Sequence, residues 1–513
     1  MRGGFAVPLN YSNPETGSIA VAAILYPSNI TSTDPEYRGP LLLNPGGPGG
    51  SGVDFLLYMD PRLREGLFGT SFDIISFDPR GTGRTTPSVS FYKSDSEATE
   101  WITQAIVNTT VEPEILQTVW DRSHGLGSLI KDNDQQDVIP YVTTDNTARD
   151  MLSIVEAMGF EKLQYYGRSY GTLLGATFAA MFPDKIERMI LDGVLEGDAY
   201  YSGHWEGQAE DTDKALGWFA SGCFSAGPEY CSFYKNASSE DAILQRVYAL
   251  IDESISNPVV VPGFNDTNAV VSFPLLKGAI FQSLYWPYTY FPLLSVALAE
   301  LEDGNGTLAY IGAGGTGALN PNSSMEKSVL DPDFVWGGLR EVSAFFAISC
   351  TDGADKIAAS LEELTSDYES LEKVSSFGDR FFPFRAWCSG WQVRPEATFR
   401  GPIAAANTSF PILIIGNEAD HITPFAAAKR VSANFPGSVV LKQNSVGHCS
   451  VSSASACTRQ YILRYLGNGT LPEPDTTCEV DLQLFIPDGN DTDGFKLNNG
   501  AGECGHCTEQ NEI

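Results

Sequence analysis

The sequence predicts an α/β protein whose core is a mostly parallel, doubly wound sheet. Short continuous apolar runs at 41–43, 163–166 and 410–416 are typical of strands that are buried on both faces. The second run leads into a small-residue helical stretch, and the third precedes a helix that opens at Thr423-Pro424. Polar or glycine-rich loops follow these runs, so we expect the reactive side chains at the carboxyl ends of the strands.

The segment Gly167-Arg168-Ser169-Tyr170-Gly171 lies between the strand-like run at 163–166 and the helical stretch at 172–181. In that context, a Gly-x-Ser-x-Gly pattern predicts the sharp strand-to-helix turn called a nucleophile elbow. The glycines let strand and helix pass close together, and the N-terminus of the helix favours developing negative charge. Because the pattern is weak by itself, the prediction depends on partners elsewhere in the chain.

Two partners for a serine nucleophile follow. Asp420 lies in the loop after the strand at 410–416, and His448 lies in the loop after a strand-like run at 438–441. A serine hydroxyl needs a base that accepts its proton near neutral pH, which His448 supplies, while Asp420 orients the imidazole. The chain order Ser169, Asp420, His448 is that of an α/β-hydrolase, so we predict a catalytic triad.

The other histidines offer no comparable arrangement. His421 stands beside the predicted acid, and we expect it to be a solvated loop residue. His124 and His204 lie in polar or aromatic surroundings that suggest no pairing of nucleophile and base. The histidines also lack the helical spacing of a metal site. We therefore predict neither a metal nor another cofactor.

The loop at 44–52, Asn-Pro-Gly-Gly-Pro-Gly-Gly-Ser-Gly, follows the strand at 41–43. A phosphate-binding loop is the competing interpretation, but neither the Lys-Ser/Thr of a P-loop nor the glycine register and acid of a dinucleotide site is present. Because few side chains block close approach, the loop suits an oxyanion hole. We predict that the backbone N–H groups of Gly47 and Tyr170 stabilise the oxyanion, by ~3 to 4 kcal/mol per donor.

These motifs, together with Phe77-Asp78-Pro79-Arg80-Gly81-Thr82-Gly83-Arg84, the Asp-x-x-Thr-Pro segment at 420–424 and Gly447-His448, resemble the tripeptidyl and prolyl aminopeptidase family of serine exopeptidases. The similarity is greatest to the secreted tripeptidyl aminopeptidase-like branch of actinomycetes and fungi, and it runs from about Val7 to Phe485. It implies an α/β-hydrolase core, a helical cap and the release of N-terminal residues from peptides.

The long interval between Ser169 and Asp420 predicts a large insertion. We expect core segments at 1–199 and 392–486, a helical cap at 200–391 and a flexible tail at 487–513. Cap helices are predicted at 211–223, 242–254, 275–301 and 334–350. The aromatic run at 281–291 is predicted to pack, with some of its rings lining the substrate site.

The composition excludes several partners. The net charge of -32, from 64 acidic and 32 basic residues, disfavours nucleic acid and anionic membranes. No apolar run approaches the ~18 to 20 residues that span a bilayer. No signal peptide is visible, and Phe5-Ala6-Val7-Pro8-Leu9 resembles the family's first mature strand. We therefore expect the exported precursor to begin upstream of Met1. The oligomeric state is left open.

Sequons and cysteines indicate export. Nine cysteines suit an oxidising compartment, and pairs are expected between Cys223 and Cys231 and between Cys350 and Cys388. The family resemblance favours a third pair, Cys457 with Cys478. Ten predicted glycosylation acceptors are Asn10, Asn29, Asn108, Asn236, Asn265, Asn305, Asn322, Asn407, Asn468 and Asn490.

The tail sequence Cys504-Gly505-His506-Cys507 spells a redox motif outside the context that such a motif requires. A thioredoxin-type site needs its cysteines at the start of a helix in a βαβ unit. Here the motif lies in a stretch rich in glycine, asparagine and acids, 487–513. We predict a disulfide or a tether instead.

The sequence predicts a secreted serine hydrolase, most simply an aminopeptidase that acts on short peptides. Pro45 stands where prolyl aminopeptidases of the family have histidine, which leaves an esterase acting on small acyl esters or a secondary metabolite as an alternative. A catalytically silent binding protein with the same fold is the alternative of another class. An aminopeptidase also needs a carboxylate for the substrate's ammonium group, and the candidates are Glu196, Asp198, Glu206 and Glu418.

Overall fold

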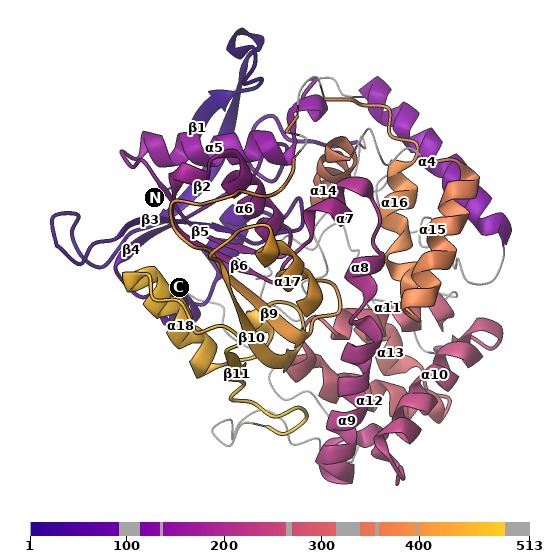
Figure 1. The fold of residues 1–513 in the computed structure, drawn as a ribbon. Coiled ribbons are helices and arrows are strands. Elements are labelled where there is room, and N and C mark those ends of the chain that lie inside the picture. Colours follow the sequence, from indigo (N-terminus) through magenta and orange to yellow (C-terminus); the bar gives the residue numbers. More distant parts are fainter. Residues whose placement is uncertain are drawn as a thin grey trace, which may run out of the picture.

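The chain is organised around one large sheet, shown in the computed structural model of Figure 1. The structure describes residues 2–91, 113–133, 137–262, 269–313, 339–353, 359–395, 398–399 and 401–487. The sheet has nine strands in the order β1-β2-β4-β3-β5-β6-β9-β10-β11. Only the pairs β1–β2 and β2–β4 are antiparallel, so the predicted α/β class with a mostly parallel sheet is confirmed.

The central strands are continuous apolar runs because both faces of the sheet are covered by other parts of the chain. In β3, Leu42 belongs to the apolar cluster on one face, whereas Leu41 and Leu43 belong to the cluster on the other. Alternate residues of the other central strands divide in the same way. The strands are β1 (Arg2–Pro8), β2 (Ser18–Tyr26), β3 (Gly39–Asn44), β4 (Phe72–Phe77), β5 (Leu163–Arg168), β6 (Ile186–Asp192), β9 (Leu413–Ala419), β10 (Val439–Val446) and β11 (Thr477–Glu479).

Helices pack on both faces of this sheet. The cluster that contains Leu41 includes residues of α1 (Gly52–Tyr58), α2 (Pro61–Phe68) and α18 (Ala456–Asn468). The cluster that contains Leu42 includes residues of α5 (Thr144–Ala157), α6 (Tyr170–Met181) and α17 (Phe425–Ala433). The parallel strands are therefore connected through helices on either face, which is a doubly wound arrangement.

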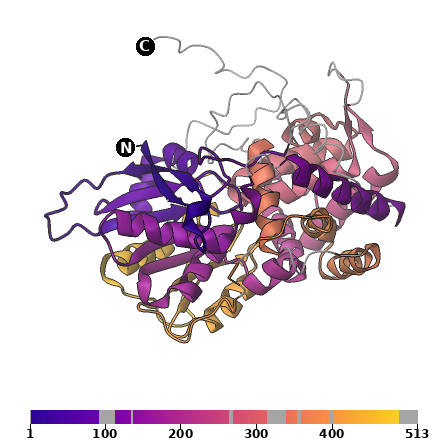
Figure 2. The same ribbon diagram turned by 90° about the horizontal axis from the view of Figure 1, so that it is seen from above.

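A mainly helical region lies between β6 and β9 and stands beside the sheet in both views (Figures 1 and 2). It also holds a small hairpin, β7 (Val259–Val260) with β8 (Val270–Val271). Its α-helices are α7 (Gly197–Ser202), α8 (Glu206–Ala209), α9 (Thr212–Tyr230), α10 (Glu240–Ser256), α11 (Phe273–Ser283), α12 (Pro287–Glu302), α13 (Thr307–Gly312), α14 (Leu339–Asp352), α15 (Leu361–Val374) and α16 (Phe382–Cys388).

Two features of this region differ from the sequence predictions. The single helix predicted at 275–301 is two helices, because Trp286 has non-helical backbone angles and Pro287 begins the second. In addition, α4 (Pro113–Asn133), which precedes the elbow in the chain, packs against the helical region. The Ser123 and Ser389 hydroxyls are hydrogen bonded at 2.7 Å, and the Trp120 indole donates to the Ala359 carbonyl at 3.0 Å.

Three disulfides are present among the described residues, and they join the three pairs of cysteines that were predicted from the sequence. Cys223 and Cys231 close a short loop at the end of α9, and Cys457 joins α18 to Cys478 of β11. Cys350 and Cys388 join α14 to α16 across a sequence separation of 38. The tail motif Cys504 to Cys507 and the acceptors Asn108, Asn265, Asn322 and Asn490 lie outside the described residues.

Loop length predicts which disulfide stabilises the fold most. Replacing both Cys350 and Cys388 by alanine should cost about 4 kcal/mol in the chain-entropy treatment, because the bond closes a long loop. The same change at Cys223 and Cys231, whose separation is 8, should cost about 2.5 kcal/mol. Thermal unfolding of the two double variants checks the order. An equal or larger loss for the shorter loop would contradict it.

Candidate active site

Ser169 occupies a strained turn between β5 and α6. Its φ of 53° and ψ of -127° are rare for a residue other than glycine, and strain of this kind is concentrated at functional sites. The flanking glycines are sterically required. A Cβ on Gly167 would lie 2.4 Å from the Gly171 carbonyl oxygen, and one on Gly171 would lie 2.7 Å from the Asn44 carbonyl oxygen. The close strand–helix crossing expected of a nucleophile elbow is therefore present.

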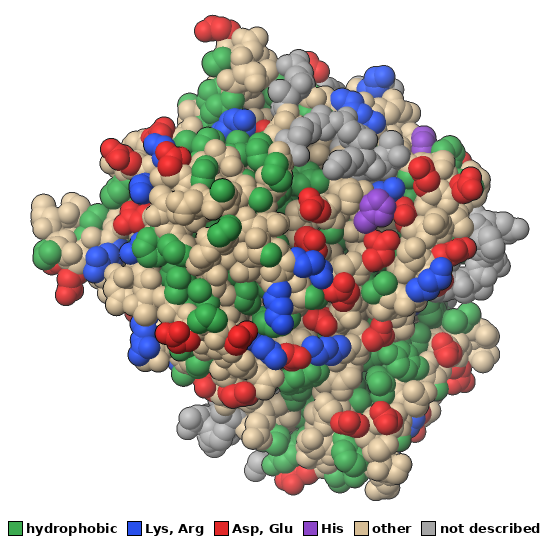
Figure 3. All heavy atoms as spheres, in the orientation of Figure 1, with side chains coloured by type: hydrophobic (Ala, Val, Ile, Leu, Met, Phe, Trp, Pro, Cys, Tyr) green, Lys and Arg blue, Asp and Glu red, His purple; other side chains and the backbone are tan. Residues whose placement is uncertain are grey.

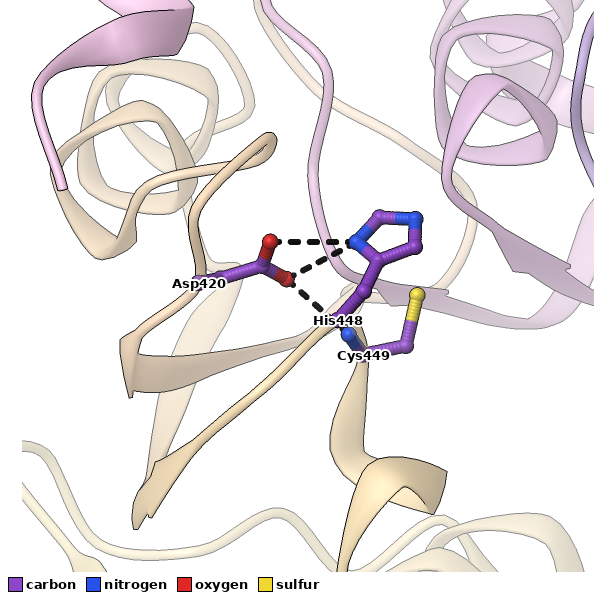
Figure 4. A group of neighbouring side chains, drawn as sticks. All are labelled: Asp420, His448 and Cys449. Carbon is purple, nitrogen blue, oxygen red and sulfur yellow. Dashed lines mark hydrogen bonds and ion pairs between the residues drawn. The ribbon is translucent and has the colours of Figure 1, made fainter. Parts of the chain in front are cut away.

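Asp420 follows β9 directly and is fully buried. Its carboxylate accepts hydrogen bonds from the N–H groups of Ile422 (3.1 Å), Thr423 (3.0 Å) and Cys449 (2.9 Å). It also accepts from the Thr423 hydroxyl (2.7 Å) and faces His448 Nδ1 at 3.0 Å (Figure 4). Burial alone would raise the pKa of Asp420, but His448 and these donors lower it to about 2.

His448 lies in the loop after β10, with a side chain that is 12% exposed. Its backbone N–H donates to the Tyr285 carbonyl oxygen at 3.2 Å, and the Tyr285 ring meets the imidazole edge-on. Burial lowers the pKa of His448, but the charge of Asp420 outweighs burial and raises it well above 6.5. With Nδ1 directed at Asp420, the second ring nitrogen, Nε2, is left for a serine hydroxyl.

The loops that carry Ser169 and His448 meet at the end of β6. The Ser169 N–H donates to the Asp192 carbonyl oxygen at 3.1 Å. The Asp192 carboxylate accepts from both the N–H (2.8 Å) and the hydroxyl (2.6 Å) of Ser450, two residues after His448. The structure thus brings the predicted nucleophile, base and acid to one edge of the sheet, at the carboxyl ends of β5, β9 and β10.

The glycine-proline loop after β3 lies directly against the elbow. A Cβ on Gly46 would come within 2.8 Å of the Ser169 Cβ and 3.1 Å of the Tyr170 nitrogen. Gly46 and Gly47 both have positive φ, at 103° and 115°, and Tyr170 is the first residue of α6. Both predicted oxyanion donors therefore belong to backbone that adjoins the serine, in conformations that a bulkier loop sequence would not adopt.

The carboxylates predicted for the substrate ammonium differ in their availability. Glu418 forms ion pairs with Lys214 (2.6 Å) and Lys442, and Glu196 pairs with Arg430 at 2.6 Å. These cations already neutralise both groups, which disfavours the role that the sequence suggested for them. Asp198 is exposed near the start of α7, and Glu206 is half-buried at the start of α8.

The structure brings two further carboxylates to the site through α14. The Glu341 carbonyl oxygen and the Phe345 nitrogen would lie 2.7 and 2.8 Å from a Cβ on Gly49, so α14 rests on the oxyanion loop. Burial and the charge of Asp54 raise the pKa of Glu341 to about 7. Burial likewise raises the pKa of Asp352 to about 7, although it accepts hydrogen bonds from Thr144 and Tyr200. No local motif in the sequence marks either residue.

His421 differs from its prediction as a solvated loop residue, because its side chain is completely buried. The ring packs between Phe281 and Tyr285, and neither ring nitrogen has a hydrogen-bond partner among the described residues. Burial lowers the pKa of His421 to about 3, so the ring is neutral. The apolar aromatic run at 281–291 therefore supplies packing around the acid as well as contact with His448.

Thr423 is a site residue for which no role was predicted from the sequence. Its hydroxyl lies 2.7 Å from Asp420 Oδ2 and 3.1 Å from His448 Nδ1, between the acid and the base. The Asp-x-x-Thr-Pro segment contained the signal, since a threonine three residues after an aspartate often closes a hydrogen-bonded turn.

The pKa directions of the acid and base predict the pH profile. Because the base acts only when neutral, kcat/KM should rise with pH through the raised pKa of His448, with a midpoint above 6.5. Asp420→Asn removes the charge that raises this pKa, so the midpoint should fall, and kcat should drop by about 10⁴. Rate measurements between about pH 5 and pH 10 provide the check. A wild-type midpoint at or below 6.5, or an unchanged midpoint in the variant, would contradict the assignment.

Comparisons with known proteins agree with this architecture. A family model described as alpha/beta hydrolase fold matches residues 39–291, and one described as TAP-like protein matches residues 373–478. The tripeptidyl aminopeptidase of Streptomyces lividans is 25% identical over 501 residues, 93% of this chain and 83% of its own. Serine protease Hip1 of Mycobacterium tuberculosis is also 25% identical over 501 residues, covering 93% and 86% of the two chains.

A relative named for a different activity matches almost as well. Carboxylesterase B of Mycobacterium tuberculosis is 24% identical over 489 residues, 92% of this chain and 85% of its own. Among solved structures, the proline iminopeptidase of Mycobacterium smegmatis aligns over 90% of this chain and 99% of its own, at 14% identity and a TM-score of 0.31, which adds nothing to the assignment. The family models and the curated relatives identify the chain as a serine hydrolase of the α/β-hydrolase fold, with a TAP-like C-terminal segment.

Proposed function

We propose that the chain is an aminopeptidase that releases short N-terminal fragments from peptides through an acyl-enzyme on Ser169. The arrangement that supports the proposal is the pair of Asp420 and His448, 3.0 Å apart, at the sheet edge that also carries Ser169 and the side-chain-poor loop after β3. Relatives that span most of the chain are named tripeptidyl aminopeptidase and serine protease, which supports a peptide substrate. A silent binding protein would have no use for an ionised acid, a base of raised pKa and a strained serine together.

The groups of the site suit the steps of acyl transfer. His448 Nε2 takes the proton of the Ser169 hydroxyl as its oxygen attacks the scissile carbonyl, and Asp420 stabilises the imidazolium that forms. The N–H groups of Gly47 and Tyr170 stabilise the resulting oxyanion. His448 then gives the proton to the leaving amine, and a water molecule, activated by the same base, hydrolyses the acyl-enzyme.

An aminopeptidase also needs a counter-charge for the substrate's free ammonium group. Of the carboxylates near the loop, Glu341 suits this role best, because it belongs to the helix that rests on Gly49. It forms no ion pair with any lysine or arginine in the described part of the chain, in contrast to Glu196 and Glu418. Its pKa of about 7 marks a half-buried carboxylate without a compensating cation, which a bound ammonium would supply.

Blocking the substrate amine tests the proposal. An N-acetylated chromogenic tripeptide should be cut at least about a hundredfold less efficiently than the free peptide, since a buried carboxylate would then lack its partner. Glu341→Gln should remove most of this difference by slowing the free peptide alone. Glu206→Gln, a half-buried carboxylate on α8, is the matched control, and Ser169→Ala should be inactive on both peptides.

Equal rates on the two peptides would overturn the aminopeptidase proposal. A loss of discrimination in Glu206→Gln instead of Glu341→Gln would assign the ammonium to α8. The second candidate function, an esterase, is favoured by the similarity to carboxylesterase B. It predicts turnover of a butyrate ester without turnover of either peptide.

We further propose that the protein is exported and glycosylated. The three disulfides support an oxidising compartment. No helix among the described residues is long and apolar enough to cross a bilayer. Five predicted acceptors are exposed, whereas Asn10 is buried, which disfavours a glycan there. The exposed acceptors are Asn29, Asn236, Asn305, Asn407 and Asn468.

Export from a eukaryotic host should therefore yield a protein whose glycans occupy exposed acceptors. Treatment with an N-glycosidase should lower its mass, and peptide mapping should find glycans at Asn236 or Asn407 and none at Asn10. An unmodified protein with reduced Cys350 and Cys388 would contradict the export proposal. A glycan at Asn10 would contradict only the expectation that its burial prevents modification.

A further inference from the structure

One thiol stands inside the proposed catalytic site. Cys449 follows the base His448 directly, is buried, and is the cysteine that the described residues leave outside the disulfides. Its sulfur, a His448 ring nitrogen and an Asp420 carboxylate oxygen all lie within 4.8 Å of one another. Figure 4 shows the three side chains converging, with the thiol below the imidazole ring and the carboxylate beside it.

The thiol is held in this position by its surroundings. Cys449 has a φ of 61°, unusual for a residue with a side chain, and its N–H is fixed by Asp420 Oδ2 at 2.9 Å. A side chain at Gly193 would fill the same space, because its Cβ would lie 2.4 Å from the sulfur. The same Cβ would lie 3.2 Å from the Thr423 hydroxyl, so this oxygen borders the thiol as well.

The four groups form a mixed set of donors. His448 Nδ1 lies 3.0 Å from Asp420 and 3.1 Å from the Thr423 hydroxyl, and the Cys449 sulfur completes the set. Imidazole, thiolate and carboxylate are the protein ligands of zinc, and thiolate also favours the softer cadmium. Magnesium and calcium need oxygen ligands alone, so this set does not suit them.

We propose that Asp420, His448 and Cys449 form an inhibitory site for a borderline-soft divalent cation such as zinc, with the Thr423 hydroxyl as a neighbouring oxygen. The ion displaces the thiol proton of Cys449, which passes to solvent, and binds Nδ1 of His448, whose neutral ring then carries its single proton on Nε2. Asp420 is already ionised and contributes its charge without losing a proton. Three protein ligands leave one position of a tetrahedral ion for Thr423 or water.

The size and accessibility of the site are compatible with such an ion. Ligand atoms around tetrahedral zinc lie roughly 3.5 Å apart, given metal–ligand distances of about 2.0 to 2.3 Å. The separations of up to 4.8 Å therefore require the sulfur to approach by about 1 Å. His448, at 12% exposure, is the member of the set that reaches the surface and offers a path of entry.

Binding at this site would stop the proposed reaction without occupying the substrate site. An ion on Nδ1 takes the place of the proton that His448 shares with Asp420. The neutral ring then carries its single proton on Nε2, so no lone pair is left there to accept the serine's proton. This consequence rests on the proposed triad, whereas binding of the ion does not.

The experiment titrates the full chain with zinc chloride and cadmium chloride in a buffer that does not bind metals. Two quantities are measured, the turnover of whichever chromogenic substrate the enzyme accepts and the ultraviolet charge-transfer band of cadmium thiolate. Because Cys504 and Cys507 are further cysteines with His506 between them, both are replaced by serine in the reference protein. This reference should still show inhibition and one cadmium per chain with a thiolate band.

Cys449→Ser, made in that reference protein, should abolish the cadmium–thiolate band. With inhibition measured relative to the variant's own metal-free rate, it should also raise the inhibitory concentration of both ions at least about tenfold. Cys449→Ala repeats the test if the serine variant does not fold. Absence of the band from the folded reference protein at saturating cadmium would overturn the proposal, even if no substrate is found. Inhibition that is unchanged in a folded Cys449 variant would overturn it as well. His204→Gln, at an exposed histidine beside Asp367, controls for surface binding and should change neither quantity.

Discussion

The geometry of the proposed catalytic site depends on one buried carboxylate, that of Asp420. Leaving a carboxylate in the interior is costly unless its lone pairs are satisfied and its charge is compensated. Here three backbone N–H groups and the Thr423 hydroxyl donate to it, and His448 supplies the compensating charge. Because the donors belong to the loops after β9 and β10, the bonds that stabilise the acid also fix the base. The hydrogen bonds of Asp420 therefore determine both the conformation of these loops and the position of the proposed base.

Two other buried aspartates accept hydrogen bonds from neighbouring loops along this edge of the sheet. Asp78 follows β4 and accepts hydrogen bonds from the Ser51 hydroxyl (2.6 Å) and the Val53 N–H (2.9 Å), which fix the end of the oxyanion loop. Asp192 ends β6 and holds Ser450, beside the base. Burial raises the pKa of both carboxyls, whereas that of Asp420 is lowered. The difference follows from the partners: Asp420 faces an imidazole, and hydroxyl and N–H groups dominate around the others.

Local sequence was sufficient to predict the parts of the site that are built from a strand and its following loop. The apolar runs predicted the confirmed α/β class, and the glycines around Ser169 and before Gly47 mark close backbone approaches that allow no side chain. The split at Trp286 and the burial of His421 were not predicted. Both depend on packing between segments far apart in the chain. The split was also hard to predict because a proline that interrupts an apolar run can either begin a helix or kink one.

The contact between α14 and the oxyanion loop shows why the remaining part of the site was beyond sequence reasoning. Gly49 touches Glu341 and Phe345 through backbone atoms, with no flexible side chain between helix and loop. A shift of α14 must therefore move the loop, because close-packed backbone cannot absorb a displacement as a long side chain can. The Cys350–Cys388 bond ties α14 to α16. It follows that the helical region would do more than cover the proposed substrate site, since its position also sets where the proposed oxyanion donors lie relative to Ser169.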